Sequence, residues 1–267
     1  MYSLTYIYHD CFILETERAI VIFDYWKDPM AGSDKDFPPL LDNIDRGKSL
    51  YVIISHHHKD HFSRRVFLWQ QRFPGIRYII SPDVAKAVRY MLREDGGGTY
   101  AGFRPAYESV SVLSPGDTFT DGTIRVKAYR STDIGNSYAL ECDGNTFFHA
   151  GDLNAWIWVD ESSPEEVRTS KEEFVEIVGE IKADHKHFDL VLFPVDSRQG
   201  SDYWWGAKHF IEQISASLFV PMHFELVLDE KDKTPRRNDA GAFSRYADPN
   251  CSQYLQLAQT RASYLHT

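Results

Sequence analysis

Leu50-Tyr51-Val52-Ile53-Ile54 is a continuous apolar run, and Ser55-His56-His57-His58-Lys59-Asp60-His61 follows it without a break. An apolar run of this length is typical of a strand that is buried on both faces. In extended chain, residues two apart project to the same side, so His56 and His58 can bind one ion together. Asp60 and the histidine after it lie where the chain turns into a helix, and they can reach a second ion. Imidazole and carboxylate ligands predict a site for zinc, iron or manganese.

Other candidate site residues also follow predicted strands. They are Asp24 after 21–23, Asp152 after 146–149, and His223 after 218–220. Side chains at the ends of adjacent strands converge on one edge of a sheet, which is how α/β folds build sites. We therefore expect these residues to join the histidine cluster. Asp196 follows another strand end and is a candidate pocket residue without an assigned role.

The order of predicted elements favours an α/β protein. Predicted strands cover 4–8, 11–15, 19–23, 50–54, 77–80, 109–113, 124–129, 138–141, 146–149, 190–193 and, as the final strand, 218–220. Predicted helices cover 64–73, 83–93, 164–183 and 207–214, and predicted loops cover 27–48, 94–98 (mobile) and 229–239 (exposed). Ser163, Pro164 and Glu166 form a capping signal at the start of the third helix, and Asp143-Gly144 is a strong hairpin signal. Strand meanders followed by helices, occurring twice, predict two halves packed sheet against sheet in a four-layer αββα sandwich. Because no low-complexity linker divides the chain, we expect one domain over residues 1–267.

Composition narrows the functional classes. The 267 residues are 43% hydrophobic and 25% charged, as in ordinary soluble globular proteins. The formal net charge of -10 argues against a nucleic-acid-binding role, because phosphate binding needs a basic face. No apolar stretch approaches the ~20 residues of a membrane span. The three cysteines, Cys11, Cys142 and Cys251, form no Cys-x-x-Cys pair, and their wide spacing favours a reducing cytoplasm.

The combined motifs resemble the metallo-β-lactamase superfamily. The similarity lies in His-x-His-x-Asp-His after an apolar strand, a later Gly151-Asp152 and a final His223. It is closest to the branch of ascorbate-phosphate lactonase-like and N-acylphosphatidylethanolamine phospholipase D-like hydrolases, whose opening strand, turn and apolar strand resemble His9 to Leu14 here.

This resemblance implies a ligand set for one or two transition metal ions, with zinc expected first and manganese or iron as alternatives. The implied first-metal ligands are His56 and His58. The implied second-metal ligands are Asp60, His61 and His223, with Asp152 bridging the two ions. Asp24 would orient a ligand imidazole, as metal-bound histidines usually require.

One departure from the family pattern concerns the first metal. The family has a further first-metal histidine between the main cluster and the Gly-Asp motif, whereas the stretch 129–137 here contains none. Asp133 is the candidate replacement, and its carboxylate would favour iron or manganese over zinc. Alternatively, the first metal is weak or missing, and Asp133 is an Asx-turn residue.

The resemblance further implies a hydrolase that uses a metal-bound hydroxide on an ester, lactone, amide or phosphodiester bond of a small molecule. Asp60 would ligate a metal and orient the hydroxide. The alternative is a catalytically silent metal-binding or sensor relative, which the missing histidine favours. Aromatic clusters at 25–26, 156–158 and 203–205 predict either pocket walls or packing in a core or subunit interface, so the oligomeric state stays open.

Overall fold

The computed structural model describes residues 1–92, 107–158, 161–224, 226–228, 235–237, 251–255, 257 and 261–267. The chain divides into two compact units. Unit 1 comprises Met1–Ala128, Leu140–Gly144 and Ala258–Thr267, and unit 2 comprises Tyr129–Ala139 and Asn145–Leu257. The expectation of a single domain over the whole chain stays a prediction.

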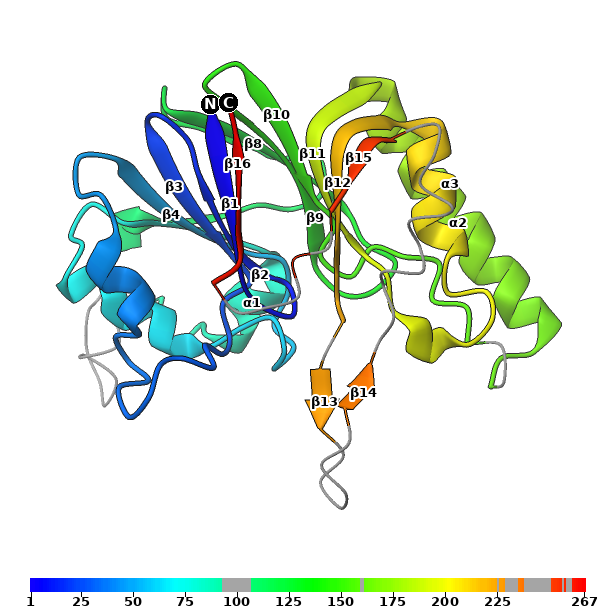
Figure 1. The fold of residues 1–267 in the computed structure, drawn as a ribbon, viewed down its shortest axis with the longest axis horizontal. Coiled ribbons are helices and arrows are strands. Elements are labelled where there is room, and N and C mark those ends of the chain that lie inside the picture. Colours follow the sequence, from blue (N-terminus) through cyan, green and yellow to red (C-terminus); the bar gives the residue numbers. More distant parts are fainter. Residues whose placement is uncertain are drawn as a thin grey trace. The chain divides into compact units, whose positions relative to one another are not determined.

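Unit 1 is built on a seven-stranded mixed sheet (Figure 1). In sheet order its strands are β16 (Ser263–His266), β1 (Tyr2–Tyr8), β2 (Cys11–Glu15), β3 (Ala19–Phe23), β4 (Ser49–Ile54), β5 (Arg77–Ile80) and β6 (Val110–Val112). β1, β2 and β3 form an antiparallel meander, and β3 to β6 run parallel. It follows that β1, β3 and β4 point the same way, so the residues after them share one sheet edge.

Short helices cover one face of this sheet. They are η1 (Pro39–Asn43), η2 (Arg64–Gln71) and α1 (Pro82–Ala87), and a further turn, η4 (Tyr107–Ser109), precedes β6. Alternate strand residues such as Ile22 and Val52 pack with Leu40 of η1, Trp69 of η2 and Val84 of α1 in one buried cluster. Burying this apolar face is the main stabilising contribution to the unit.

The predicted helices of unit 1 need two corrections. Residues 64–71 form a 3-10 helix, which ends before the predicted 73. The α-helix predicted for 83–93 begins one residue earlier, with Pro82 in its first turn, and ends at Ala87. A further helix, η1, lies inside the predicted loop 27–48. The mobile loop predicted at 94–98 lies outside the described residues.

The second sheet also has seven strands. In sheet order they are β15 (Cys251–Tyr254), β12 (Ser215–Met222), β11 (His187–Pro194), β10 (Asn145–His149), β9 (Asn136–Cys142), β8 (Ile124–Arg130) and β7 (Thr118–Thr120). β10, β11, β12 and β15 are parallel. Figure 1 shows α2 (Pro164–Asp184) and α3 (Trp205–Gln213) along one side of β11 and β12. Phe210 of α3 stacks on Phe148 of β10 with ring centroids 5.0 Å apart, so the helix face is tied to the sheet.

Two local sequence signals are confirmed. Ser163 caps α2 in a full capping box with Glu166, and Pro164 occupies the first turn. At the turn between β9 and β10, Asp143 has φ 49° and Gly144 has φ 77°. Positive φ at both central residues is the type I′ geometry that an Asp-Gly hairpin favours.

The prediction that 218–220 is the final strand is wrong. β12 spans Ser215–Met222, and β13 (Leu226–Leu228), β14 (Pro235–Arg237), β15 and β16 follow it. β14 lies inside the predicted loop 229–239, whose other residues lie outside the described ranges. β16 pairs antiparallel with β1, at the opposite end of the chain. A strand this short is stabilised by its distant partner rather than by its own pattern, so local periodicity does not reveal it.

Two mixed sheets with helices confirm the expected α/β class.

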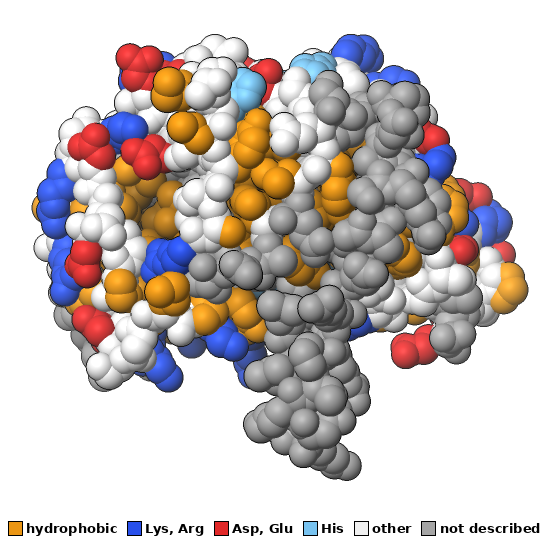
Figure 2. Space-filling view, in the orientation of Figure 1, with side chains coloured by type: hydrophobic (Ala, Val, Ile, Leu, Met, Phe, Trp, Pro, Cys, Tyr) orange, Lys and Arg blue, Asp and Glu red, His pale blue; other side chains and the backbone are white. Residues whose placement is uncertain are grey.

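Figure 2 shows both signs of charge spread over the face of unit 1 that it draws, with Lys and Arg side chains along its lower margin. None of the helices within the described ranges has the length and apolar character that a bilayer span requires.

Candidate metal centre

Three imidazoles of the histidine motif converge within unit 1. The His56 ring centroid lies 4.6 Å from that of His58 and 4.0 Å from that of His61. His56 and His61 are fully buried, whereas His58 is exposed. The strand β4 delivers His56 at its end, and the turn after it brings His61 back, with its backbone N–H donating to His58 O at 3.1 Å. The motif therefore folds as a compact cluster rather than as a solvated histidine tract.

A buried carboxylate sets the orientation of two of these rings. Asp24 accepts hydrogen bonds from the Ser55 backbone N–H at 2.7 Å, the Ser55 Oγ at 2.5 Å and the His61 Nδ1 at 2.9 Å. Ser55 Oγ also lies 3.0 Å from His56 Nδ1. Because an ionised carboxylate only accepts, Ser55 donates its hydroxyl proton to Asp24 and accepts from His56 Nδ1–H. We assign both imidazoles as Nδ1–H tautomers, so their Nε2 atoms present lone pairs suited to a metal.

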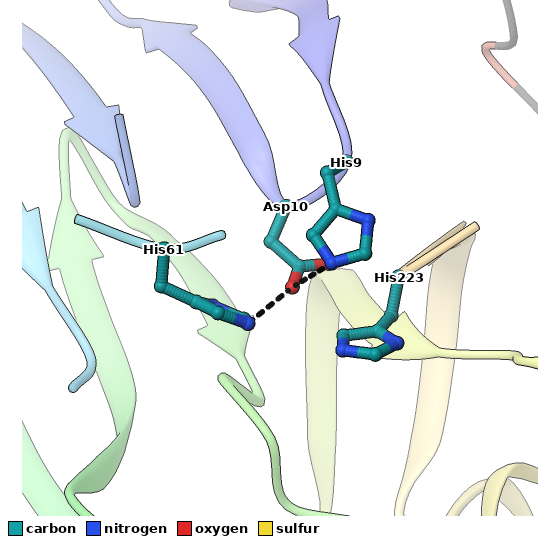
Figure 3. Close-up of side chains that lie close together, drawn as sticks. All are labelled: His9, Asp10, His61 and His223. Carbon is teal, nitrogen blue, oxygen red and sulfur yellow. Dashed lines mark ion pairs between the residues drawn. The ribbon is translucent and has the colours of Figure 1, made fainter. Parts of the chain in front are cut away.

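The turn between β1 and β2 adds a buried carboxylate, Asp10, to which the sequence analysis gave no role. Asp10 is fully buried, with its Oδ2 3.2 Å from His61 Nε2 and 3.7 Å from His9 Nε2 (Figure 3). His9, Asp10 and His61 offer ligand atoms that lie within 4.8 Å of one another. The position of Asp10 at a strand end could have identified it, because β1 ends at the same sheet edge as β3 and β4. The rule that selected Asp24 applies equally to the turn at His9-Asp10.

Asp60 contacts the cluster through His9. Its Oδ2 lies 3.5 Å from the buried His9 Nε2, and about half of the Asp60 side chain is exposed. The interaction with His9 holds the pKa of Asp60 below its ordinary range, although partial burial opposes this. Asp60 therefore stays ionised at neutral pH and retains acceptor capacity for a water or a cation.

Unit 2 places a second carboxylate–histidine pair at the ends of β11 and β12. His223, also drawn in Figure 3, has its Nδ1 3.1 Å from Asp196 Oδ2 and its Nε2 3.4 Å from Asp152 Oδ1. Arg198 Nε donates to both oxygens of Asp196 at 2.9 Å. Burial raises the pKa of Asp196, but hydrogen bonds from His223 and Arg198 outweigh it and hold that pKa below its ordinary range. An ionised Asp196 accepts from His223 Nδ1–H, so His223 directs Nε2 toward Asp152, as in the His61–Asp24 arrangement.

Thr132 joins the loops that present Asp133 and Asp152. Its hydroxyl lies 2.5 Å from Asn154 O and 3.1 Å from Asn154 N. Ligand atoms of Asp133 and Asp152 lie within 4.8 Å of each other. The exposed Asp133 also accepts from the Ile134 backbone N–H at 2.7 Å, a local turn contact. The structure thus brings Asp133 close to Asp152, and its role as a ligand stays a prediction.

The aromatic clusters at 156–158 and 203–205 have different surroundings: the first lies beside candidate ligands and the second packs between helices. Trp156 donates its indole N–H to Asp152 O at 2.7 Å, and its ring centroid lies 5.1 Å from that of His223. Trp205 instead stacks on His209 of the same helix and contacts Phe174, which is packing between α2 and α3. His149 is a buried core residue that accepts from the Gly151 N–H at 3.1 Å.

Comparison with known proteins agrees with the motifs. Residues 3–165, more than half of the chain, match the family described as the β-lactamase superfamily domain. The chain belongs to the β-lactamase superfamily. A comparison with curated proteins finds no match.

Solved structures show the same fold at low sequence identity. Igni18, a metallo hydrolase from the archaeon Ignicoccus hospitalis, has a TM-score of 0.65 and 16% identity, over 100% of this chain and 99% of that one. YhfI from Bacillus subtilis, a metallo-β-lactamase fold protein, has a TM-score of 0.61 and 10% identity, over 99% and 100%. CmlA from Streptomyces venezuelae, a diiron β-hydroxylase, has a TM-score of 0.63 and 13% identity, over 98% of this chain and 54% of CmlA.

The superfamily assignment confirms the predicted metallo-β-lactamase fold class. The finer assignment to the lactonase-like and phospholipase D-like branch stays a prediction. The buried imidazole and carboxylate groups in each unit are of the types that bind a transition metal. In His56, His61 and His223 an oxygen lies at Nδ1, which leaves Nε2 as the ligand atom.

Proposed function

We propose that this superfamily member is a metal-dependent hydrolase acting on an ester, lactone, amide or phosphodiester bond of a small molecule. The observation that supports it most directly is the Asp24–Ser55 pair, which fixes the His56 and His61 tautomers for metal binding. A buried carboxylate that orients two imidazoles is expected at a metal site. Packing of a hydrophobic core does not require one. A solvated histidine tract would leave these contacts to water.

The proposed ligands come from both units. In unit 1 they are His56, His58, Asp60 and His61, and in unit 2 they are Asp133, Asp152 and His223. We add Asp10 as a candidate, because its carboxylate meets His61 Nε2 within unit 1. Bound divalent ions would supply Lewis-acid polarisation of the scissile bond and lower the pKa of water at the site.

Asp60 is the residue that we propose to act on the attacking water. Its low pKa keeps it ionised, and His9 holds it in place from the buried side. Its partly exposed carboxylate can therefore accept a hydrogen bond from a water and orient the oxygen lone pair toward the substrate.

Metal content tests the site first. The measurement is inductively coupled plasma mass spectrometry on full-length protein purified without a metal-affinity tag. About two ions per chain would support Asp133 as the replacement for the missing histidine, and about one would support a single-metal mechanism. No bound ion after incubation with zinc, manganese or iron would contradict the proposal and favour the silent relative.

Activity tests the chemistry. A screen of generic phosphodiester, lactone, thioester and ester substrates should yield an activity that falls at least 100-fold in both His58→Ala and Asp60→Ala. His57→Ala is the matched control, because His57 lies in the same motif yet its imidazole pairs with Asp83 outside the ligand set. Activity that survives both ligand changes would identify a contaminant.

A second candidate activity is oxidation at an iron centre. The feature that favours it is the carboxylate of Asp133 where the family has a histidine, because carboxylate-rich sites suit iron and manganese more than zinc. Iron as the predominant metal in the purified protein, with no hydrolysis of any screened ester, would favour this candidate over the hydrolase.

A further inference from the structure

We propose that a cavity of unit 1 beside the histidine motif binds the anionic group of a small organic substrate. The cavity has a volume of about 440 Å³, within the usual range of small-molecule sites. Its walls come from the loop after β3 and from the segment that follows the motif. This inference names the substrate class of the site under Proposed function and rests on that function.

The cavity is attached to the metal-ligand segments through the chain itself. Tyr25, in its wall, directly follows Asp24, and Ser63 follows His61 by two residues. The Ser63 backbone N–H donates to Tyr25 O at 2.9 Å and joins the two walls. A ligand in this cavity therefore lies next to the sheet edge that presents the imidazoles of unit 1.

The charges of the lining are predominantly positive. Lys27, Lys35 and Arg65 face a single lining carboxylate, Asp28. Asp28 is already bound by Arg261, whose guanidinium lies 2.6 Å from Asp28 Oδ2. Arg65 pairs with Asp36. Among the described residues, neither Lys27 nor Lys35 forms an ion pair with a carboxylate, so the two ammonium groups supply the positive excess.

A positive cavity stands out in a chain with a formal net charge of -10. The two ammonium groups of Lys27 and Lys35 give this cavity a local positive charge that attracts an external anion.

The remaining wall is apolar and aromatic. Tyr25 is buried, and Trp26 is partly exposed beside it. Lys27 Nζ lies 4.6 Å from the Tyr8 ring centroid and 5.4 Å from that of Trp26, which holds the ammonium over the aromatic rings. The Trp26 ring also meets His9 edge-on at 6.4 Å. Cations beside an aromatic wall fit a carboxylate or phosphate joined to an apolar or ring-shaped group.

Calorimetry on the full-length protein as purified tests this inference with three matched probes. They are 1-naphthyl phosphate, 1-naphthoate and the neutral 1-naphthol. We expect one or both anions to bind at least tenfold more tightly than naphthol, and the better anion distinguishes a phosphate from a carboxylate site. In Lys27→Ala/Lys35→Ala the Kd for that anion should rise about tenfold, while the weak binding of naphthol stays unchanged.

The matched control is Lys86→Ala/Lys186→Ala, which removes two exposed lysines outside the cavity. This variant should bind the anion as the unaltered protein does. Equal loss in both double variants would show a general charge effect and overturn the proposal. Equal affinity for naphthol and the anions, or no binding of either anion, would overturn it as well. Because Lys27 and Lys35 are exposed, their replacement leaves folding intact.

Hydrolysis separates this inference from the proposed function. With an active ester series, kcat/KM for an anionic ester should fall about tenfold in Lys27→Ala/Lys35→Ala, and kcat/KM for its neutral analogue should not change. A protein that binds the anion through these lysines yet hydrolyses nothing would retain the anion site and contradict the hydrolase.

Discussion

At the residue scale, Asp24 is the clearest test of the metal site. It accepts from the backbone N–H and the hydroxyl of Ser55 and from His61 Nδ1–H, so Asp24→Ala leaves three buried donors unsatisfied and lets two imidazoles rotate. We expect metal affinity, measured by chelator competition, to fall about 10- to 100-fold. The free energy of unfolding should fall by about 1–3 kcal/mol.

Asp83→Ala provides the control for Asp24. Asp83 also holds a histidine of the motif, but that residue is His57, which is exposed and outside the ligand set. Its replacement should leave metal affinity within twofold of the unaltered protein. A comparable loss of affinity in both variants would mean that Asp24 acts through general stability rather than through ligand orientation.

Asp143 gives a pH-dependent prediction at the same scale. Burial opposes its ionisation, but hydrogen bonds from the Arg18 side chain and backbone outweigh burial and lower the pKa of Asp143 to about 2. The unfolded value is about 3.9, so the stabilising contribution is fully present above that pH and is lost as the pH falls toward 2. The gap in urea-unfolding free energy between the unaltered protein and Asp143→Asn should be largest above about pH 5 and narrow toward pH 2. A gap that does not vary with pH would contradict this assignment.

At the element scale, the start of α3 determines the position of the Asp152 loop. A Cβ at Gly206 would overlap Asn154 Oδ1, and it would lie 3.1 Å from the Ala155 backbone N, tighter than most Cβ contacts in proteins. Gly206→Ala must therefore displace Asn154, which is tied through Thr132 to the loop of Asp133. We expect a loss of stability of about 1–3 kcal/mol together with weaker metal binding.

Gly179→Ala in α2 is the matched change for Gly206. A Cβ at Gly179 meets nothing within 4 Å, and the residue lies inside a regular helix. This substitution should raise stability by about 0.4–1 kcal/mol and leave metal binding unaltered. If thermal unfolding and metal content changed alike in both variants, close packing at Gly206 would not be the cause.

At the scale of the whole molecule, metal binding should stabilise the folded chain. An ion that binds only the folded state, at 100 times its Kd, adds about 2.7 kcal/mol to the unfolding free energy. Zinc or manganese should therefore raise Tm in the unaltered protein and in His57→Ala, and a chelator should reverse the shift. His58→Ala should show a smaller shift, and equal shifts in both variants would count against His58 as a ligand.

The local features of this fold could be predicted because contiguous residues encode them. The apolar run 50–54, the capping residues of α2 and the Asp143-Gly144 turn each express a short-range preference, and each was found where the sequence placed it. The strand-end rule also identified Asp24, which the structure shows on His61. The motif His56 to His61 together with the Gly-Asp motif was sufficient for the superfamily.

Only the tertiary structure decided the parts that depend on distant segments. The role of Asp196 depends on Arg198 and on His223 from the next strand of the sheet, and no local pattern encodes that contact. Asp10 reads as a turn residue in sequence, yet it is fully buried against His61 because β1 ends at the edge where β4 ends. β16 forms a strand because it pairs with β1, which lies at the other end of the chain. Local preferences set which residues form strands, turns and caps, whereas the free energy of burial and pairing between remote segments selects the neighbours of each side chain.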